Sequence, residues 1–133
     1  MKRILACLAS VFLAASSFAG DFPDISVSEV KALVKAKGAT VIDVNGSASY
    51  AKRHVPGALD FDVIEKELAK SLPADKDSLI IAYCGGPKCN AYQAAAKAAT
   101  QLGYKNVKHM SAGISGWVEA GLKTEKARKQ KKS

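Results

Sequence analysis

Residues 78–90 read SLIIAYCGGPKCN, a run of mostly apolar residues that gives way to a glycine-rich turn with two cysteines. The compact apolar run at 78–83 predicts a buried β-strand. Cys84 follows directly at its carboxyl end, and an alanine-rich segment at 91–102, closed by Gly103, predicts a helix. A strand that leads through a short loop into a helix is the unit from which parallel α/β sheets are built.

The rest of the chain alternates strand and helix signals in the same way. Further strands are predicted at residues 25–27, 40–44, 58–61 and 107–110. Helices are predicted to start at Ser26, Ser47, Asp62 and Gly113. We therefore predict a single α/β domain with a five-stranded, mostly parallel sheet and helices on both faces.

The amino-terminal residues 1–19 have the layout of a secretory signal peptide. Lys2 and Arg3 give a basic start, an apolar run follows at 4–15, and cleavage is expected after Ala19. A membrane-spanning anchor needs about 20 apolar residues, so this run predicts a cleaved leader and no stable membrane anchor. We expect an exported protein, periplasmic or secreted.

Positive charge is concentrated at the other end of the chain. The formal net charge is +8, and residues 123–133, KTEKARKQKKS, contain six basic residues and one acidic residue. The tail has no apolar periodicity, so we predict that it is disordered and solubilising, with docking to an anionic lipid surface as the alternative. The domain itself, residues 20–122, is then nearly neutral. We expect a monomer without a nucleic-acid partner.

Sites in open parallel α/β sheets form at the carboxyl ends of the strands. Asp43, Cys84 and Gly113 each follow a predicted strand, so we expect them to meet at one edge of the sheet. Asp43 is expected either to hydrogen-bond the amides of the cysteine loop or to cap its own strand end. Gly113 is expected to let the backbone approach the site closely.

Cys84 is the candidate nucleophile. Its loop leads into the amino terminus of a helix, where backbone N–H groups lack partners and carry partial positive charge. Lys88 adds a positive charge within the turn, and Gly85 and Gly86 let the backbone curl around the sulfur. These features favour the thiolate form of Cys84. The alternative is a buried cysteine that only packs.

Three segments resemble the rhodanese-like, or sulfurtransferase homology, domain family. The matching residues are VIDV at 41–44, Tyr50, HVPGA at 54–58, IIAYC at 80–84, GYKNV at 103–107, AGI at 112–114, Trp117 and Gly121. They occur in the family's order and spacing over residues 25–121. The resemblance implies the rhodanese-like fold, in a single-domain exported member.

The same resemblance implies sulfur transfer through Cys84. The family's loop cysteine takes a sulfane sulfur from thiosulfate or a persulfide donor, holds it as a persulfide, and passes it to cyanide or a thiol. The residues implied to bind substrate are those of the loop: Gly85, Gly86, Pro87, Lys88, Cys89 and Asn90. No cofactor or metal is expected, because the cysteines and histidines do not form a zinc pattern.

The loop departs from the family pattern in two ways. The family commonly has an arginine near the end of this loop, where the present chain has Lys88, Cys89 and Asn90. A lysine supplies a point charge instead of two parallel hydrogen bonds, so thiosulfate is expected to bind more weakly. The loop is also one residue longer than usual, and longer loops belong to phosphatases and arsenate reductases of the superfamily.

Cys89 is a second thiol within the loop. We hypothesise that it is a resolving thiol, which attacks the Cys84 persulfide, releases sulfide and leaves a Cys84–Cys89 disulfide. The alternative is that Cys89 only packs at the start of the helix. Two other functions stay open: a thiol–disulfide or arsenate-type redox enzyme that uses both cysteines, and a rhodanese-fold binding module without turnover.

Overall fold

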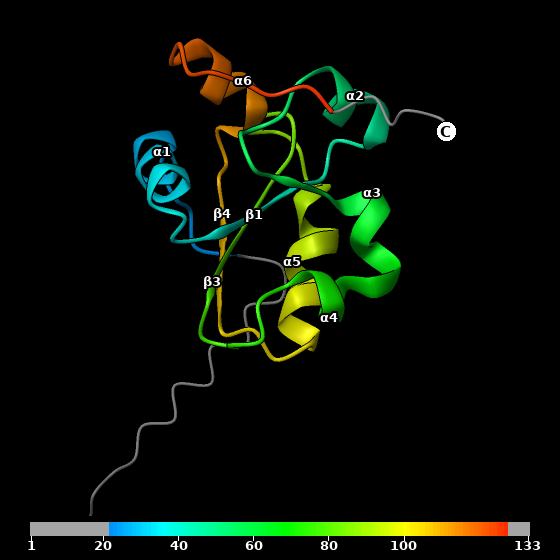
Figure 1. Cartoon of the computed structure of the whole chain (residues 1–133). Coiled ribbons are helices and arrows are strands. Elements are labelled where there is room, and N and C mark those ends of the chain that lie inside the picture. Colours follow the sequence, from blue (N-terminus) through cyan, green and yellow to red (C-terminus); the bar gives the residue numbers. More distant parts are fainter. Residues whose placement is uncertain (1–21, 128–133) are drawn as a thin grey trace, which may run out of the picture.

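A computed structural model describes residues 22–127 of the chain (Figure 1). Its elements, in chain order, are α1 (Val27–Ala36), β1 (Thr40–Asp43), α2 (Ser47–Lys52), β2 (Leu59–Asp60), α3 (Phe61–Ile64), the 3-10 helix η1 (Glu65–Glu67), α4 (Leu68–Ser71), β3 (Leu79–Tyr83), α5 (Tyr92–Gln101), β4 (Asn106–His109) and α6 (Gly113–Glu119). The predicted signal peptide at 1–19 lies outside the described residues.

The strands form one parallel sheet in the order β2-β1-β3-β4. β3 pairs with a neighbour on each side, so that Ile81 lies opposite Val41 on one strand and Lys108 on the other. Its residues from Ile80 to Tyr83 are all buried, as expected for a strand covered on both faces. The predicted α/β class with a parallel sheet is confirmed.

The sheet of the described chain has four strands instead of the predicted five. The segment expected as an edge strand at 25–27 contributes only an isolated parallel bridge between Asp24 and His109, made by two backbone hydrogen bonds of 2.9 Å. Pairing stops there for two reasons. Pro23 has no N–H to donate, and Ser26 already caps α1.

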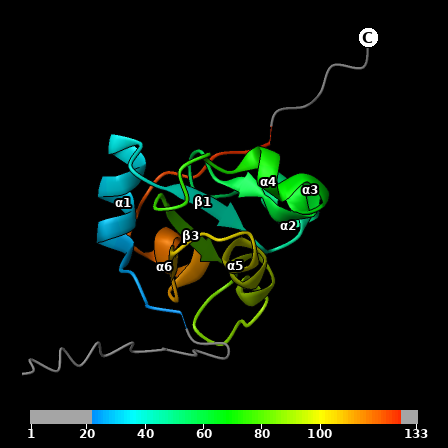
Figure 2. The same ribbon diagram turned by 90° about the horizontal axis from the view of Figure 1, so that it is seen from below.

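Helices cover both faces of the sheet (Figure 1, Figure 2). α1 and α6 lie on one face, where Val30 and Trp117 pack in one apolar cluster with Ile81. α3, α4 and α5 lie on the other face, where three fully buried alanines of α5 share a cluster with Ile80 and Ala82. Removing these side chains from water is the main favourable term that holds the layers together.

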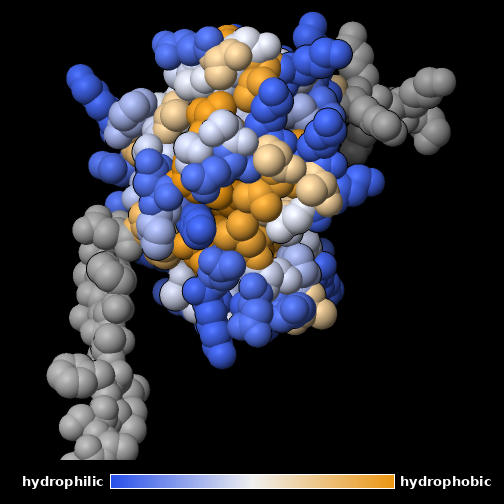
Figure 3. All heavy atoms as spheres, turned by 90° about the vertical axis from the view of Figure 1, so that its left-hand side faces the viewer, coloured by the Kyte–Doolittle hydropathy of each residue, from blue (hydrophilic) through white to orange (hydrophobic). Residues whose placement is uncertain are grey.

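Seen from the side of α1, the surface shows a central area of apolar side chains ringed by hydrophilic ones (Figure 3). Elsewhere on the described chain the most exposed large apolar side chain is that of Val63, with 71% of its surface accessible. Every helix within residues 22–127 is too short or too polar to cross a membrane.

Residues 123–127, the first part of the predicted disordered tail, are ordered in the structure. Glu125 forms an antiparallel bridge with His54 through two backbone hydrogen bonds of 2.9 Å, and Trp117 Nε1 donates to the carbonyl of Lys123 at 2.8 Å. The prediction was therefore wrong for residues 123–127, because backbone pairing orders a polar segment that has no apolar periodicity. The remaining tail residues lie outside the described part of the chain.

Candidate active site

Cys84 directly follows β3, and only 1% of its surface is exposed. Side chains alternate along a strand, so Cys84 faces the same side of the sheet as Ala82. Both residues share an apolar cluster with Tyr92, the first residue of α5. The end of β3 therefore places the sulfur beside the start of α5, where the sequence predicts it.

The loop after β3 turns Cys89 back toward Cys84. The Cys89 N–H donates to the Gly86 carbonyl at 3.0 Å, which makes residues 86–89 a β-turn with Pro87 at its second position. Cys84 and Cys89 form a disulfide, and their Cα atoms lie 6.2 Å apart, within the usual range for such a bond. The structure therefore shows the site in its oxidised state.

The other loop residues lie around this disulfide at the surface. Lys88 and Asn90 are exposed, and Gly85 and Gly86 are half-buried. The backbone N–H groups of these four residues have no acceptor in the described part of the chain. Together with the charge of Lys88, these N–H groups are the donors that the loop offers to an anion.

The start of α6 fixes the backbone of the cysteine loop through hydrogen bonds and a close contact. The N–H groups of Ile114 and Ser115 donate to the carbonyls of Cys84 and Gly85, at 3.0 Å each. Gly113, with φ +63°, lies so close that a Cβ atom there would be 2.6 Å from the carbonyl carbon of Gly85. Only glycine fits this approach without displacing backbone. Ser115 was missed from sequence, since no motif distinguishes it.

The segment after β1 reaches the same loop. The side-chain oxygen of Asn45 lies 3.7 Å from the position that a Cβ of Gly85 would take. The ends of β1, β3 and β4 are thus brought together around residues 84–86. This is the convergence of three strand ends that the parallel topology predicts.

Asp43 is fully buried at the end of β1 and forms a network below the loop. Its Oδ1 accepts from the Asn45 N–H at 2.8 Å and its Oδ2 accepts from the Tyr83 hydroxyl at 2.5 Å, while that hydroxyl accepts from the Val55 N–H at 3.0 Å. Within residues 22–127 its partners do not include the loop amides. The second predicted role, a cap at its own strand end, is the one observed.

The pKa values of both ionisable groups in this network, Asp43 and Tyr83, are raised. Burial raises the pKa of Asp43 above its ordinary value, against the opposing effect of its hydrogen bonds. Burial, followed by the nearby Asp43 carboxylate, raises the pKa of Tyr83, so the phenol stays protonated and donates. Tyr83 was also missed from sequence, because its partner is 40 residues away.

His109 is a buried titratable residue near the loop. The register of β4 places it opposite Ala82, two residues before Cys84, and its ring stacks on Tyr92 with centroids 3.3 Å apart. Its Nε2 has no hydrogen-bond partner among residues 22–127. Burial lowers the pKa of His109, so the ring is neutral at pH 7 and packs beside the site without adding charge.

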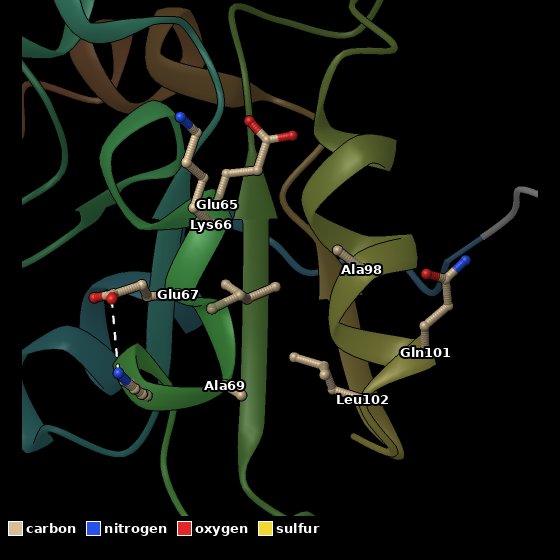
Figure 4. Close-up of a pocket in the computed structure, with 9 residues that line it drawn as sticks. Glu65, Lys66, Glu67, Ala69, Ala98, Gln101 and Leu102 are labelled. Atoms are coloured by element: carbon tan, nitrogen blue, oxygen red, sulfur yellow. Dashed lines mark ion pairs between the residues drawn. The ribbon is translucent and has the colours of Figure 1, made fainter.

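A separate hollow of about 440 Å³ lies between the η1–α4 segment and the last turn of α5. Figure 4 shows Ala98 and Leu102 directed toward the facing segment, with a Glu67–Lys70 ion pair of 3.6 Å at the rim. Because this hollow is at the carboxyl-terminal end of α5, it is remote from Cys84. Residues 22–127 contain no group of three or more His, Cys, Asp or Glu placed to hold a metal.

Comparison with known proteins agrees with this architecture. Residues 26–120 match the sequence model of the rhodanese-like domain. The chain therefore belongs to the rhodanese-like domain family, and the resemblance seen in its motifs is confirmed.

Two relatives and one solved structure show the range of proteins that share this domain. The chain is 32% identical over 117 residues to the HTH-type transcriptional regulator Rv0324 of Mycobacterium tuberculosis, covering 86% of this chain but only 50% of the regulator. It is 30% identical over 98 residues to the thiosulfate sulfurtransferase GlpE of Pseudomonas entomophila, covering 73% of this chain and 85% of GlpE. The thiosulfate sulfurtransferase structure from Pseudomonas aeruginosa superposes with a TM-score of 0.66 and 30% identity, over 80% of this chain and 20% of that one.

Proposed function

We propose that this protein is a sulfurtransferase that moves a sulfane sulfur from thiosulfate or a persulfide donor to a thiophilic acceptor through Cys84. The observation that carries the proposal is the placement of Cys84 at the end of β3, in a loop where four backbone N–H groups lack acceptors within the described chain. They belong to Gly85, Gly86, Lys88 and Asn90. Membership of the rhodanese-like family supports it, as do one relative and one solved structure that are named thiosulfate sulfurtransferase.

The chemistry takes two displacements at sulfur. The Cys84 thiolate attacks the outer sulfur of thiosulfate, the sulfur–sulfur bond breaks, and sulfite leaves with the bonding electrons. The persulfide anion on Cys84 is stabilised by the N–H groups of Gly85 and Gly86 and by the charge of Lys88. An acceptor such as cyanide then attacks the outer sulfur, which restores the Cys84 thiolate and releases thiocyanate.

The test is thiocyanate formation from thiosulfate and cyanide, with protein that has been reduced and then freed of reductant. Wild type and Cys89→Ser should form thiocyanate, and Cys84→Ser should not, while far-UV circular dichroism checks that all three are folded. Equal rates in Cys84→Ser and wild type would overturn the proposal. Loss in both variants would favour a redox enzyme that needs both thiols, and no activity with any sulfane donor would favour a binding module.

A thiol–disulfide enzyme is the second candidate, because the structure contains the Cys84–Cys89 disulfide. In this reading the loop exchanges two electrons with a thiol substrate and carries no sulfane sulfur. Disulfide reduction that needs both cysteines, without persulfide formation, would support it.

We also propose that the mature protein works in the periplasm or outside the cell, on small molecules and as a monomer. The support for export is the leader-like pattern at residues 1–19. Expression of the full chain followed by cell fractionation and intact-mass measurement should find an exported protein that starts at Gly20. An uncleaved cytoplasmic product would contradict this.

A further inference from the structure

The two sulfurs of the loop differ in their surroundings. Cys84 is 1% exposed and belongs to the apolar cluster beneath α5. Cys89 is only partly buried, and the residues on either side of it, Lys88 and Asn90, are exposed. A thiol that comes from solvent therefore meets the disulfide at the Cys89 sulfur.

The disulfide also shows that Sγ of Cys89 can reach Sγ of Cys84. In a Cys84 persulfide, the transferable sulfur is attached to that same Sγ of Cys84. Attack by Cys89 on the inner Sγ expels the outer sulfur as sulfide, whereas attack on the outer sulfur would only move it to Cys89. The β-turn at 86–89 holds Cys89 on the side of Cys84 where the inner attack is possible.

Resting on the sulfurtransferase function above, we propose that the protein also reduces sulfane sulfur to sulfide, and that a dithiol reductant regenerates it by attacking Cys89. The Cys89 thiolate forms a bond to Sγ of Cys84, and the bond from that Sγ to the sulfane sulfur breaks. Hydrosulfide leaves with the electron pair and the proton from the Cys89 thiol. The sulfane sulfur is reduced by two electrons, and the two cysteine sulfurs are oxidised to the disulfide.

Regeneration consumes one dithiol in each cycle. One thiolate of the dithiol attacks Sγ of Cys89, and Cys84 leaves as a thiolate. The second thiol of the reductant then closes its own disulfide and frees Cys89 as a thiol. The greater exposure of Cys89 therefore selects its Sγ as the point of attack.

A single-turnover experiment without external thiol tests the first step. Thiosulfate is added to reduced, desalted protein, and sulfite, sulfide and intact mass are measured. Wild type should release one sulfite and one sulfide per chain and end two hydrogens lighter, as the disulfide. Cys89→Ser should release sulfite alone and keep one extra sulfur on Cys84.

The outcomes separate the two proposals. If wild type retains a stable persulfide beside a free Cys89 thiol, sulfide release is refuted while sulfur transfer stands. If neither protein gains sulfur or releases sulfite, the sulfurtransferase function itself fails.

The point of attack is tested on the disulfide form with glutathione as the probe thiol. Samples are quenched with acid, the free thiols are blocked and the protein is digested with trypsin, which cuts after Lys88 and so separates the two cysteines. The glutathione adduct is expected on the peptide that begins at Cys89, with Cys84 recovered as a blocked free thiol. An adduct mainly on Cys84 would overturn the assignment of the attacked sulfur.

Discussion

Replacement of Gly113 by alanine should push the cysteine loop away from α6. The added Cβ would lie 2.6 Å from the carbonyl carbon of Gly85 and 2.7 Å from the carbonyl oxygen of Cys84. Both neighbours are backbone atoms, so no side-chain rotation relieves the contact, and overpacking of this kind costs about 1–3 kcal/mol. The left-handed backbone at φ +63° adds about 1–2 kcal/mol for a residue with a Cβ. We therefore expect the free energy of unfolding to fall by about 2–5 kcal/mol.

Gly121→Ala is the matched control for this change. Gly121 has φ +75°, but a Cβ there would meet nothing within 4 Å, so only the backbone cost of about 1–2 kcal/mol applies. Urea denaturation of both variants separates the two contributions. The Gly113 variant should also form the Cys84 persulfide more slowly, because Ile114 holds the Cys84 carbonyl. Equal stability losses in the two variants would refute the close-contact argument.

Four smaller changes test the surroundings of the site. Tyr83→Phe should lower the free energy of unfolding by about 1–3 kcal/mol in urea titration, because buried Asp43 loses a hydrogen bond; an unchanged midpoint would contradict this. Because burial raises the pKa of Asp43, the folded state binds protons more tightly than the unfolded chain, so stability should fall as pH rises above 3.8. Asp43→Asn should remove that slope. Because burial lowers the pKa of His109, wild type should lose stability as pH falls below 6.5, and His109→Gln should flatten this loss in the same pH series. Glu125→Gln should change stability by less than about 1 kcal/mol, since its side chain is 55% exposed and its carboxylate lies 3.8 Å from His54 Nε2.

The sequence predicted an element correctly wherever the pattern that determines it lies within one continuous segment. The apolar run before Cys84 predicted a buried strand, which the structure confirms, and the glycine-rich turn after it marked the loop. The capping pair of Ser26 and Glu29 predicted α1, and the cap hydrogen bond is present at 3.2 Å. Since parallel strands all end at one edge, the convergence of the strand ends before Cys84 and Gly113, and of the segment after Asp43, followed from the same patterns.

Features that depend on distant partners could not be read from the sequence. Tyr83 looked like one more apolar strand residue, yet its hydroxyl joins Asp43 to the Val55 amide. The backbone of Glu125 is ordered by pairing with His54, although the surrounding tail has the composition of a disordered segment. In both cases, the deciding hydrogen bond joins segments that no local periodicity relates.

The loop of this chain has Cys89 in the stretch where the family commonly has an arginine, and this difference affects turnover. A guanidinium near the end of the loop would hold an anionic donor and leave the nucleophile free. In this chain the loop carries Cys89 instead, and the structure has it bonded to Cys84. A sulfur in a disulfide has no thiolate to offer, so the oxidised protein cannot accept a sulfane sulfur until that bond is reduced. Sulfur transfer that starts from the oxidised protein must therefore begin with reduction of the Cys84–Cys89 disulfide.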